Sequence, residues 1–196
     1  ERSGAASAEG SRPAPAAPRD HRQRSVQQEA DAWLLERFAP LADYLAVNVS
    51  SPNTIGLRRL QARDHLESLL TSLVERRSEL EVRPPILVKV APDLSDVELD
   101  DSLDAILSAG VEGVIATNTT ISREAVDSPV RSETGGLSGA PLRQRSTAMI
   151  REIHRRTAGK LPIIGVGGIM SVDDARAKLD AGADLIQVYT GMIYRG

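Results

Sequence analysis

Short segments of apolar, strand-forming residues alternate with longer amphipathic segments along most of this chain. The expected strands lie at 43–49, 86–91, 113–118, 162–168 and 184–190. They are continuous apolar runs, which is typical of parallel strands that are covered on both faces. Strict alternation of such strands with helices predicts an α/β fold, in which right-handed crossovers join parallel strands.

The segments between the strands carry apolar residues at three- and four-residue offsets, which predicts helices. Ser95 and Glu98 have the spacing of a capping box, and Ser171 is the expected N-cap of the last helix. One more helix is expected before the first strand, over 26–41. Its expected apolar side consists of Ala30, Trp33, Leu34 and Phe38.

Residues 1–25 differ from the rest in composition, since they are rich in Ala, Pro, Ser, Gly and Arg. They contain no Leu, Ile, Val, Phe, Tyr or Trp, so they cannot bury enough apolar surface to offset the entropy of ordering. We expect a disordered low-complexity tail over 1–25 and one folded domain over 26–196.

Composition excludes several functional classes. The net charge is −3 and aromatic residues make up 3%, which argues against a nucleic-acid-binding module. The absence of cysteine excludes disulfides and thiolate chemistry. The three histidines fall in the tail and in polar helical segments, so we expect no metal site and no histidine base.

The length of 196 residues is short for a complete (β/α)₈ barrel, which takes about 250 residues. With five expected strands, the sequence predicts a partial barrel of about five of the eight βα units. It opens with Glu rather than Met, and we expect a fragment that is cut at both ends.

Polar residues or glycines follow each expected strand at its carboxyl end. In a parallel barrel these ends meet on one side, where the active sites of barrel enzymes are built. Turn residues are also common after strands, so one such cluster alone carries little weight. The five clusters are Asn48–Thr54, Lys89, Thr117–Thr119, Gly165–Gly168 and Tyr189–Thr190.

Lys89 stands between Val88 and Val90 inside an expected parallel strand, where an unpaired lysine is rare, and this favours a functional role. The glycines of 165–168 do not complete a dinucleotide fingerprint, because Met170 occupies the place of its third glycine. Glycines between a late strand and a helix can instead present N–H groups to a phosphate.

Six segments together resemble dihydroorotate dehydrogenase, in the order of that family, over about residues 41–196. They are NVSSPNT (48–54), LVKVAPDL (87–94), ATNTT (116–120), RSETGGLSGAPL (131–142), PIIGVGGI (162–169) and LIQVYT (185–190). The serine at position 51 makes the chain similar to the class 2, quinone-linked enzymes of this family. Class 1 relatives carry a cysteine at the same position of the motif.

The resemblance implies a (β/α)₈ barrel that binds FMN and oxidises dihydroorotate to orotate in pyrimidine biosynthesis. Ser51 would be the base that takes the C5 proton, with Thr54 as a candidate relay, and Lys89 would stabilise charge on the flavin. The residues implied in cofactor binding are Asn48, Lys89, Thr117, Gly139, Gly167, Gly168, Tyr189 and Thr190. Those implied in substrate binding are Asn48, Ser50, Ser51, Pro52, Asn53, Asn118 and Thr119.

The resemblance also implies a quinone acceptor and a peripheral location on the cytoplasmic side of the cell membrane. In such enzymes, N-terminal helices would contact the quinone and the membrane. We expect this chain to lack those helices, and also the first three strands of the barrel. We expect the polypeptide alone to bind FMN weakly and to be inactive. Two alternatives remain: another FMN barrel oxidoreductase acting on pyrimidines, or a non-catalytic half-barrel, either a truncated product or one that pairs with a partner.

Overall fold

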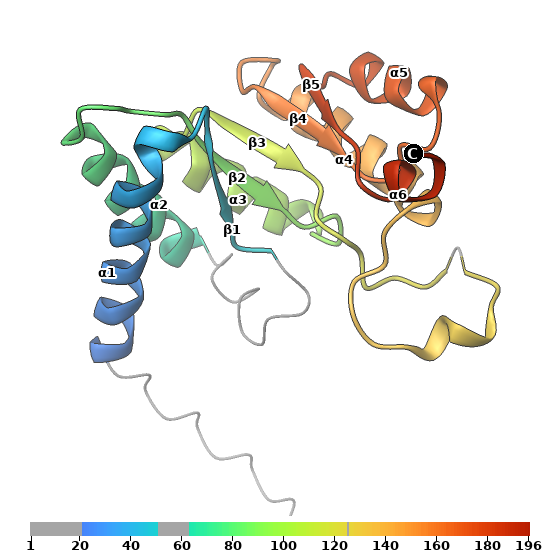
Figure 1. Ribbon diagram of the computed structural model, residues 1–196, viewed down its shortest axis with the longest axis horizontal. Helices are drawn as coiled ribbons and strands as arrows, with labels where there is room; N and C mark the ends of the chain where they lie inside the picture. Colours follow the sequence, from blue (N-terminus) through green and yellow to red (C-terminus); the bar gives the residue numbers. More distant parts are fainter. Residues whose placement is uncertain (1–20, 51–62, 125) are drawn as a thin grey trace, which may run out of the picture.

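A parallel five-stranded sheet forms the centre of the protein in a computed structural model, which describes residues 21–50, 63–124 and 126–196. The strand order is β1-β2-β3-β4-β5, so each strand pairs with its neighbours in sequence. The strands are β1 (Leu45–Asn48), β2 (Ile86–Val90), β3 (Gly113–Ala116), β4 (Ile163–Val166) and β5 (Leu185–Gln187). The predicted α/β class with a parallel sheet is confirmed (Figure 1).

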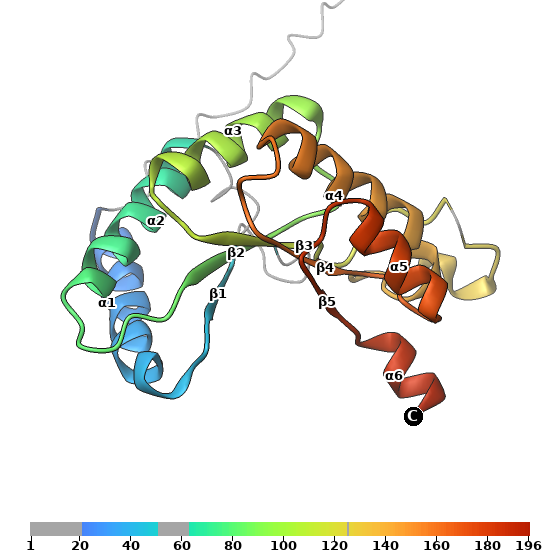
Figure 2. The ribbon, with the colours of Figure 1, turned by 90° about the horizontal axis from the view of Figure 1, so that it is seen from above.

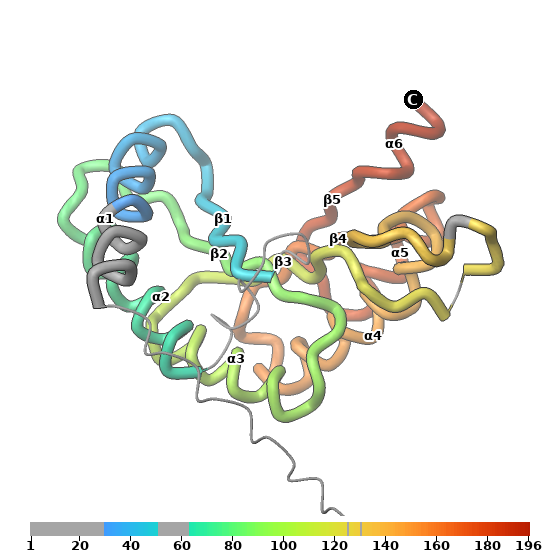
Figure 3. Tube along the Cα trace, turned by 90° about the horizontal axis from the view of Figure 1, so that it is seen from below, coloured from blue at the N-terminus to red at the C-terminus, as the bar shows by residue number. Residues whose placement is uncertain are grey.

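The helices that connect the strands lie along one side of a curved sheet, as the two end-on views show (Figures 2 and 3). These helices are α2 (Arg63–Ser78), α3 (Asp96–Ser108), α4 (Arg143–Arg156) and α5 (Val172–Asp180). α1 (His21–Phe38) precedes β1, and the short α6 (Thr190–Arg195) follows β5. A curved sheet with crossover helices only on its outer side is the geometry of part of a (β/α)₈ barrel wall, as predicted.

Two apolar clusters lie on opposite faces of the sheet, because successive side chains of a strand alternate in direction. On the outer face, Val88, Val114 and Ile163 belong to the large core that the helices share. On the inner face, a second and smaller cluster is formed by Leu87, Ile115, Ile164 and Val166. The three central strands are therefore apolar on both faces, which explains their continuous apolar sequences.

The two edge strands depart from the prediction that every strand is covered on both faces. β1 alternates between half-buried and exposed residues, and Leu185 of β5 is 63% exposed. None of the connecting helices α2 to α5 lies over the inner face, so the inward side chains of the edges stay open (Figures 2 and 3). The last strand is also shorter than predicted, because Thr190 already begins α6.

The helix before β1 differs from its prediction in start and in orientation. α1 begins at His21, so residues 21–25, which we assigned to the disordered tail, are helical. Arg and Gln in this stretch are good helix formers. A prediction from apolar content alone does not take this helix propensity into account. The buried side of α1 carries Leu35, which is 5% exposed. Trp33, which belongs to the side expected to be buried, is instead 62% exposed.

The predicted capping box at the start of α3 is present. The Ser95 hydroxyl accepts a hydrogen bond from the Glu98 N–H, and the Glu98 carboxylate accepts one from the Ser95 N–H. We expect Ser95→Ala to lower the free energy of unfolding by about 1 kcal/mol, because an N–H of the first turn loses its acceptor. Urea denaturation measures this, with Ser108→Ala as the control, since Ser108 is an exposed serine at the end of α3. Equal effects of the two changes would contradict the capping role.

Candidate functional site

A cavity of about 330 Å³ lies at the carboxyl ends of the strands. Side chains and backbone from the ends of β2, β3, β4 and β5 line it, together with the turn before the 3-10 helix η4 (Ala140–Leu142). Nine of the residues expected at the site are among its lining: Lys89, Thr117, Asn118, Thr119, Gly139, Gly167, Gly168, Tyr189 and Thr190. The structure thus brings together groups from four strands, while their individual roles remain predictions.

Four expected site residues, Ser51, Pro52, Asn53 and Thr54, lie outside the described residues. Asn48 and Ser50 do not line the cavity, but they adjoin it through hydrogen bonds. The Asn118 Nδ2 group donates to Asn48 Oδ1 at 3.0 Å and lies 3.1 Å from Ser50 Oγ. The fully buried Ser50 hydroxyl donates to the Lys89 carbonyl oxygen at 2.6 Å. The ends of β1, β2 and β3 are therefore joined in one polar cluster.

The amide groups of this cluster suit a ring that carries both N–H and C=O groups, because each amide offers donors and an acceptor. Asn118 Oδ1 accepts a hydrogen bond from the Thr119 N–H at 2.8 Å, which helps fix the orientation of its amide plane. Asn118 is thereby held from both of its ends, and the position of its polar atoms is set before any ligand arrives.

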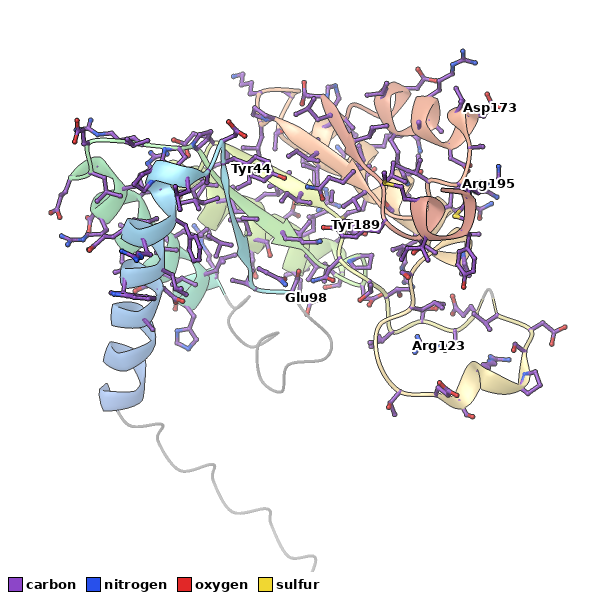
Figure 4. The ribbon with its side chains drawn as sticks, in the orientation of Figure 1. Tyr44, Glu98, Arg123, Asp173, Tyr189 and Arg195 are labelled. Atoms are coloured by element: carbon purple, nitrogen blue, oxygen red, sulfur yellow. The ribbon has the colours of Figure 1, made fainter. Side chains whose placement is uncertain are left out.

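Lys89 projects from β2 on the inner face of the sheet, since its strand neighbours Val88 and Val90 belong to the outer core. Its ammonium nitrogen lies 5.3 Å from the centroid of the Tyr189 ring, a cation–π distance. Tyr189 lies directly after β5 (Figure 4). Partial burial lowers the pKa of Lys89 below its usual 10.5, because desolvation disfavours the ammonium form.

Gly168 closes the turn after β4 with a φ of +71°, a conformation that favours glycine. A Cβ at this position would lie 2.4 Å from the Arg143 Cα and 2.5 Å from the Arg143 nitrogen. The turn is therefore pressed against the first residue of α4. Next to it, the Ser146 hydroxyl donates to the Val166 carbonyl oxygen at 2.5 Å and ties α4 to the end of β4.

The loop between β3 and α4 supplies the remaining wall of the cavity and is held by two charged side chains. The Arg123 guanidinium donates to the carbonyl oxygens of Glu133 and Gly135, at 3.1 and 2.7 Å (Figure 4). Asp93 accepts from the Thr120 hydroxyl at 2.5 Å and pairs with Arg145 at 3.3 Å. The Arg123 bonds join the two arms of the loop to each other, and Asp93 joins the start of the loop to α4.

The sequence interpretation missed several residues that line the cavity, among them Ser138 and Gln187. Ser138 Oγ lies 3.1 Å from Thr190 Oγ1, which joins the loop to the start of α6. Gln187 of β5 donates to the hydroxyl of Tyr44, the residue before β1, at 2.7 Å. The signal that singled out Lys89, a polar residue inside an apolar run, applies equally to Gln187 in DLIQVYT.

The chemistry of the donor set fits a flavin phosphate ester. Gly167 and Gly168 line the cavity between β4 and the start of α5, and a turn of this kind can present backbone N–H groups to an anion. Lys89 on the inner face offers a positive charge to a ring system, and Thr190 and Ser138 offer hydroxyls at the same wall. The residues present can therefore hold a phosphate at one end of the cavity and a polar ring at the other.

The family model of dihydroorotate dehydrogenase matches residues 22–196, nearly all of the chain. The chain belongs to the dihydroorotate dehydrogenase family. The resemblance carried by the six sequence segments is thus confirmed, and it extends further toward the N-terminus than those segments do.

Relatives of known name place the chain near the quinone-linked members. It is 52% identical over 163 residues to dihydroorotate dehydrogenase (quinone) of Anaeromyxobacter sp. strain Fw109-5, covering 83% of this chain and 45% of the relative. With the enzyme of the same name from Bordetella avium it shares 52% identity over 178 residues, or 87% of this chain and 51% of the relative. The chain spans about half the length of the curated relatives it matches.

Solved structures of the family show the same fold. The ligand-free dihydroorotate dehydrogenase of Eimeria tenella superimposes with a TM-score of 0.83 at 42% identity, over 86% of this chain and 52% of that one. Its complex with ferulenol gives the same TM-score and covers 50% of that chain. Among the helices of the described residues, none is long and apolar enough to cross a membrane.

Proposed function

We propose that the protein containing this chain oxidises dihydroorotate to orotate with FMN as cofactor and quinone as electron acceptor. The observation that carries the proposal is the cavity at the strand carboxyl ends. There Lys89, the Asn118 cluster and the glycine turn lie together in a chain of this family. A peripheral position at the cytoplasmic face of the cell membrane follows as part of the same proposal.

FMN, when bound, would supply the two-electron redox chemistry that links oxidation of the substrate to reduction of the quinone. The residues of this chain orient the reactants and manage charge. Asn48 and Asn118 bind the substrate ring through amide hydrogen bonds, with their planes fixed by Ser50 and Thr119. Lys89, which lines the cavity, would offer a positive charge to the flavin ring and so stabilise negative charge on it during oxidation of the substrate.

Ser51 takes the proton from C5 of the substrate in this proposal, with Thr54 as the relay that passes the proton on. A serine hydroxyl is a weak base at neutral pH, so it needs such a relay and a desolvated, oriented substrate. In the sequence, Ser51 directly follows Ser50 and Thr54 comes four residues after Ser50. The Ser50 hydroxyl is anchored to the carbonyl oxygen of Lys89, which ties the residue before Ser51 to the strand that carries Lys89.

We expect Ser51→Ala to slow flavin reduction by dihydroorotate about 10²- to 10⁴-fold, the range for loss of a positioned general base. Anaerobic stopped-flow absorbance of the flavin in the full-length protein measures this in a single turnover. Ser78→Ala, a change of an exposed serine on α2, is the control and should leave the rate unaltered.

Three results would contradict parts of the proposal. Reduction by Ser51→Ala at the wild-type rate would remove the serine from the role of base. Bleaching by another dihydropyrimidine and not by dihydroorotate would assign a different substrate. Failure of the full-length protein to bind any flavin would overturn the proposal as a whole.

A further inference from the structure

Lys178 is the largest fully buried side chain of the described residues, although it is a charged one. It lies on α5, and its ammonium group donates to the Arg143 carbonyl oxygen at 3.0 Å and to the Thr147 hydroxyl at 2.7 Å. Both acceptors are neutral, and no carboxylate lies within ion-pairing distance of Lys178 in the part of the chain that the structure describes. A buried cation without an ionic partner is costly, so its retention calls for a reason beyond packing.

The place of Lys178 in the fold connects it to the glycine turn. Arg143, whose carbonyl oxygen it binds, is the residue whose nitrogen and Cα press against Gly168. At Gly165, a Cβ would meet the Lys178 Cβ at 3.3 Å, so the lysine also packs behind the end of β4. Only one layer of backbone therefore separates the ammonium group from the turn that lines the cavity.

The charges around this turn do not cancel. Arg143 pairs with Asp174 at 2.9 Å, and Asp174 also accepts from the Met170 N–H at 3.0 Å. Burial alone would raise the pKa of Asp174, but these hydrogen bonds outweigh it and lower that pKa, so the carboxylate stays ionised. Arg143, Lys178 and Asp174 together carry a formal charge of +1 behind the turn. Asp173, the other acidic residue in the first turn of α5, is exposed and pairs with Arg176.

Two helix N-termini add to this charge. α4 begins at Arg143 and α5 at Val172, and their first turns flank the glycine turn; Asp173 marks that of α5 in Figure 4. The positive ends of both helix dipoles therefore point to the same region as the net charge of the cluster. An anion at the turn would compensate the buried cation that no carboxylate pairs.

We propose that Lys178 is a positioning residue for the cofactor phosphate, which holds the first turn of α4 against Gly168 and supplies uncompensated positive charge behind the phosphate-binding turn. This inference rests on the proposed function, because it assumes that FMN binds at this cavity. Lys178 touches no ligand itself and acts through the backbone of Arg143.

Phosphate binding and protonation of Lys178 should be coupled if the proposal is right. A purely structural role of Lys178 would not produce this coupling. Burial lowers the pKa of Lys178 to about 8, with Asp174 raising it and Arg143 lowering it further; β4 adds only apolar side chains there. If the charge of Lys178 stabilises the phosphate, the phosphate must stabilise that charge to the same extent. Binding of FMN then raises the pKa of Lys178, whereas riboflavin, which has no phosphate, does not.

NMR titration of the lysine side chains in the full-length protein measures this shift. The described chain has three lysines, which act as internal references for one another. We expect FMN to raise the pKa of Lys178 by about one unit, equivalent to a tenfold gain in affinity. Riboflavin should leave it unchanged. Lys89, on the ring side of the cavity, should respond alike to both flavins, and the exposed Lys160 to neither.

Binding measurements give the second arm. Lys178→Met should reduce the affinity for FMN about tenfold relative to that for riboflavin, and Lys160→Met should leave this ratio unchanged. Inorganic phosphate alone should raise the pKa of Lys178 in the wild-type protein, which would support recognition of the phosphate rather than of the ring.

The outcomes separate this inference from the proposed function. FMN binding without a shift at Lys178, or equal shifts with FMN and riboflavin, would overturn the inference and leave the proposed function standing. Binding of neither flavin would overturn both. Should Lys178→Met fail to fold, the titration of the wild-type protein still decides.

Discussion

Gly168→Ala should abolish detectable flavin binding and lower the free energy of unfolding by about 2 to 5 kcal/mol. Two costs combine at this position. An alanine at a φ of +71° costs about 1–2 kcal/mol, and a Cβ 2.4 Å from the Arg143 Cα forces the turn and α4 apart, at a further 1–3 kcal/mol. The displaced backbone then no longer presents its N–H groups to the phosphate.

Gly110→Ala provides the matched control for this change. Gly110 has a φ of +74° at the end of α3, and nothing lies within 4 Å of its Cβ position. It carries the conformational cost without the clash, so we expect a loss of about 1–2 kcal/mol and unchanged flavin affinity. Urea denaturation and flavin fluorescence titration measure the two quantities. Flavin affinity in Gly168→Ala equal to that of Gly110→Ala would exclude the turn from the binding site.

Lys89→Met should slow substrate-dependent flavin reduction about 10²- to 10³-fold, the usual effect of removing one preorganised charge from a site. The thioether chain keeps much of the volume of lysine, so packing against β1 and β3 is preserved while the charge is lost. Stopped-flow absorbance measures the rate, and Lys160→Met, at an exposed lysine, serves as the control. A rate within a factor of two of wild type would remove Lys89 from the chemistry.

The same lysine predicts the direction of a pH effect. The protonated form carries the positive charge, so its contribution is present at low pH and is lost as the pH rises through the pKa of Lys89. Burial lowers that pKa, and the loss therefore begins below the usual 10.5 of a lysine. The rate in wild type should decline on the alkaline side, and this decline should be missing in Lys89→Met. A decline that persists in the variant would belong to another group.

Where local rules decide structure, the sequence was a good guide. Continuous apolar runs predicted β2, β3 and β4, because these strands are packed on both faces. Ser95 and Glu98 marked the start of α3, since a capping box needs only residues of one turn. Convergence of the polar strand ends on one cavity followed from parallel pairing alone, without knowledge of any side-chain contact.

Prediction failed where a neighbour in space chooses which side of an element is buried. On α1 the large apolar residues Trp33 and Phe38 are exposed, whereas Leu35 of the same helix is buried. The hydrophobicity of its residues alone cannot predict which side of α1 is buried, because the buried side is the one that contacts α2 and the sheet. The roles assigned to Ser51 and Thr54 stay predictions, since both lie outside the described residues.

Helix α5 shows most clearly what the sequence determines and what the tertiary structure decides. Sequence alone determined that 171–181 is a helix after a glycine turn, in a chain of this family, because caps and apolar spacing act within a few residues. Tertiary structure decided that Lys178 is buried while its neighbour Leu179 is 47% exposed. One position along a helix turns a side chain by about 100°. Lys178 is the side chain that faces α4, where its ammonium group donates hydrogen bonds to the Arg143 carbonyl oxygen and the Thr147 hydroxyl.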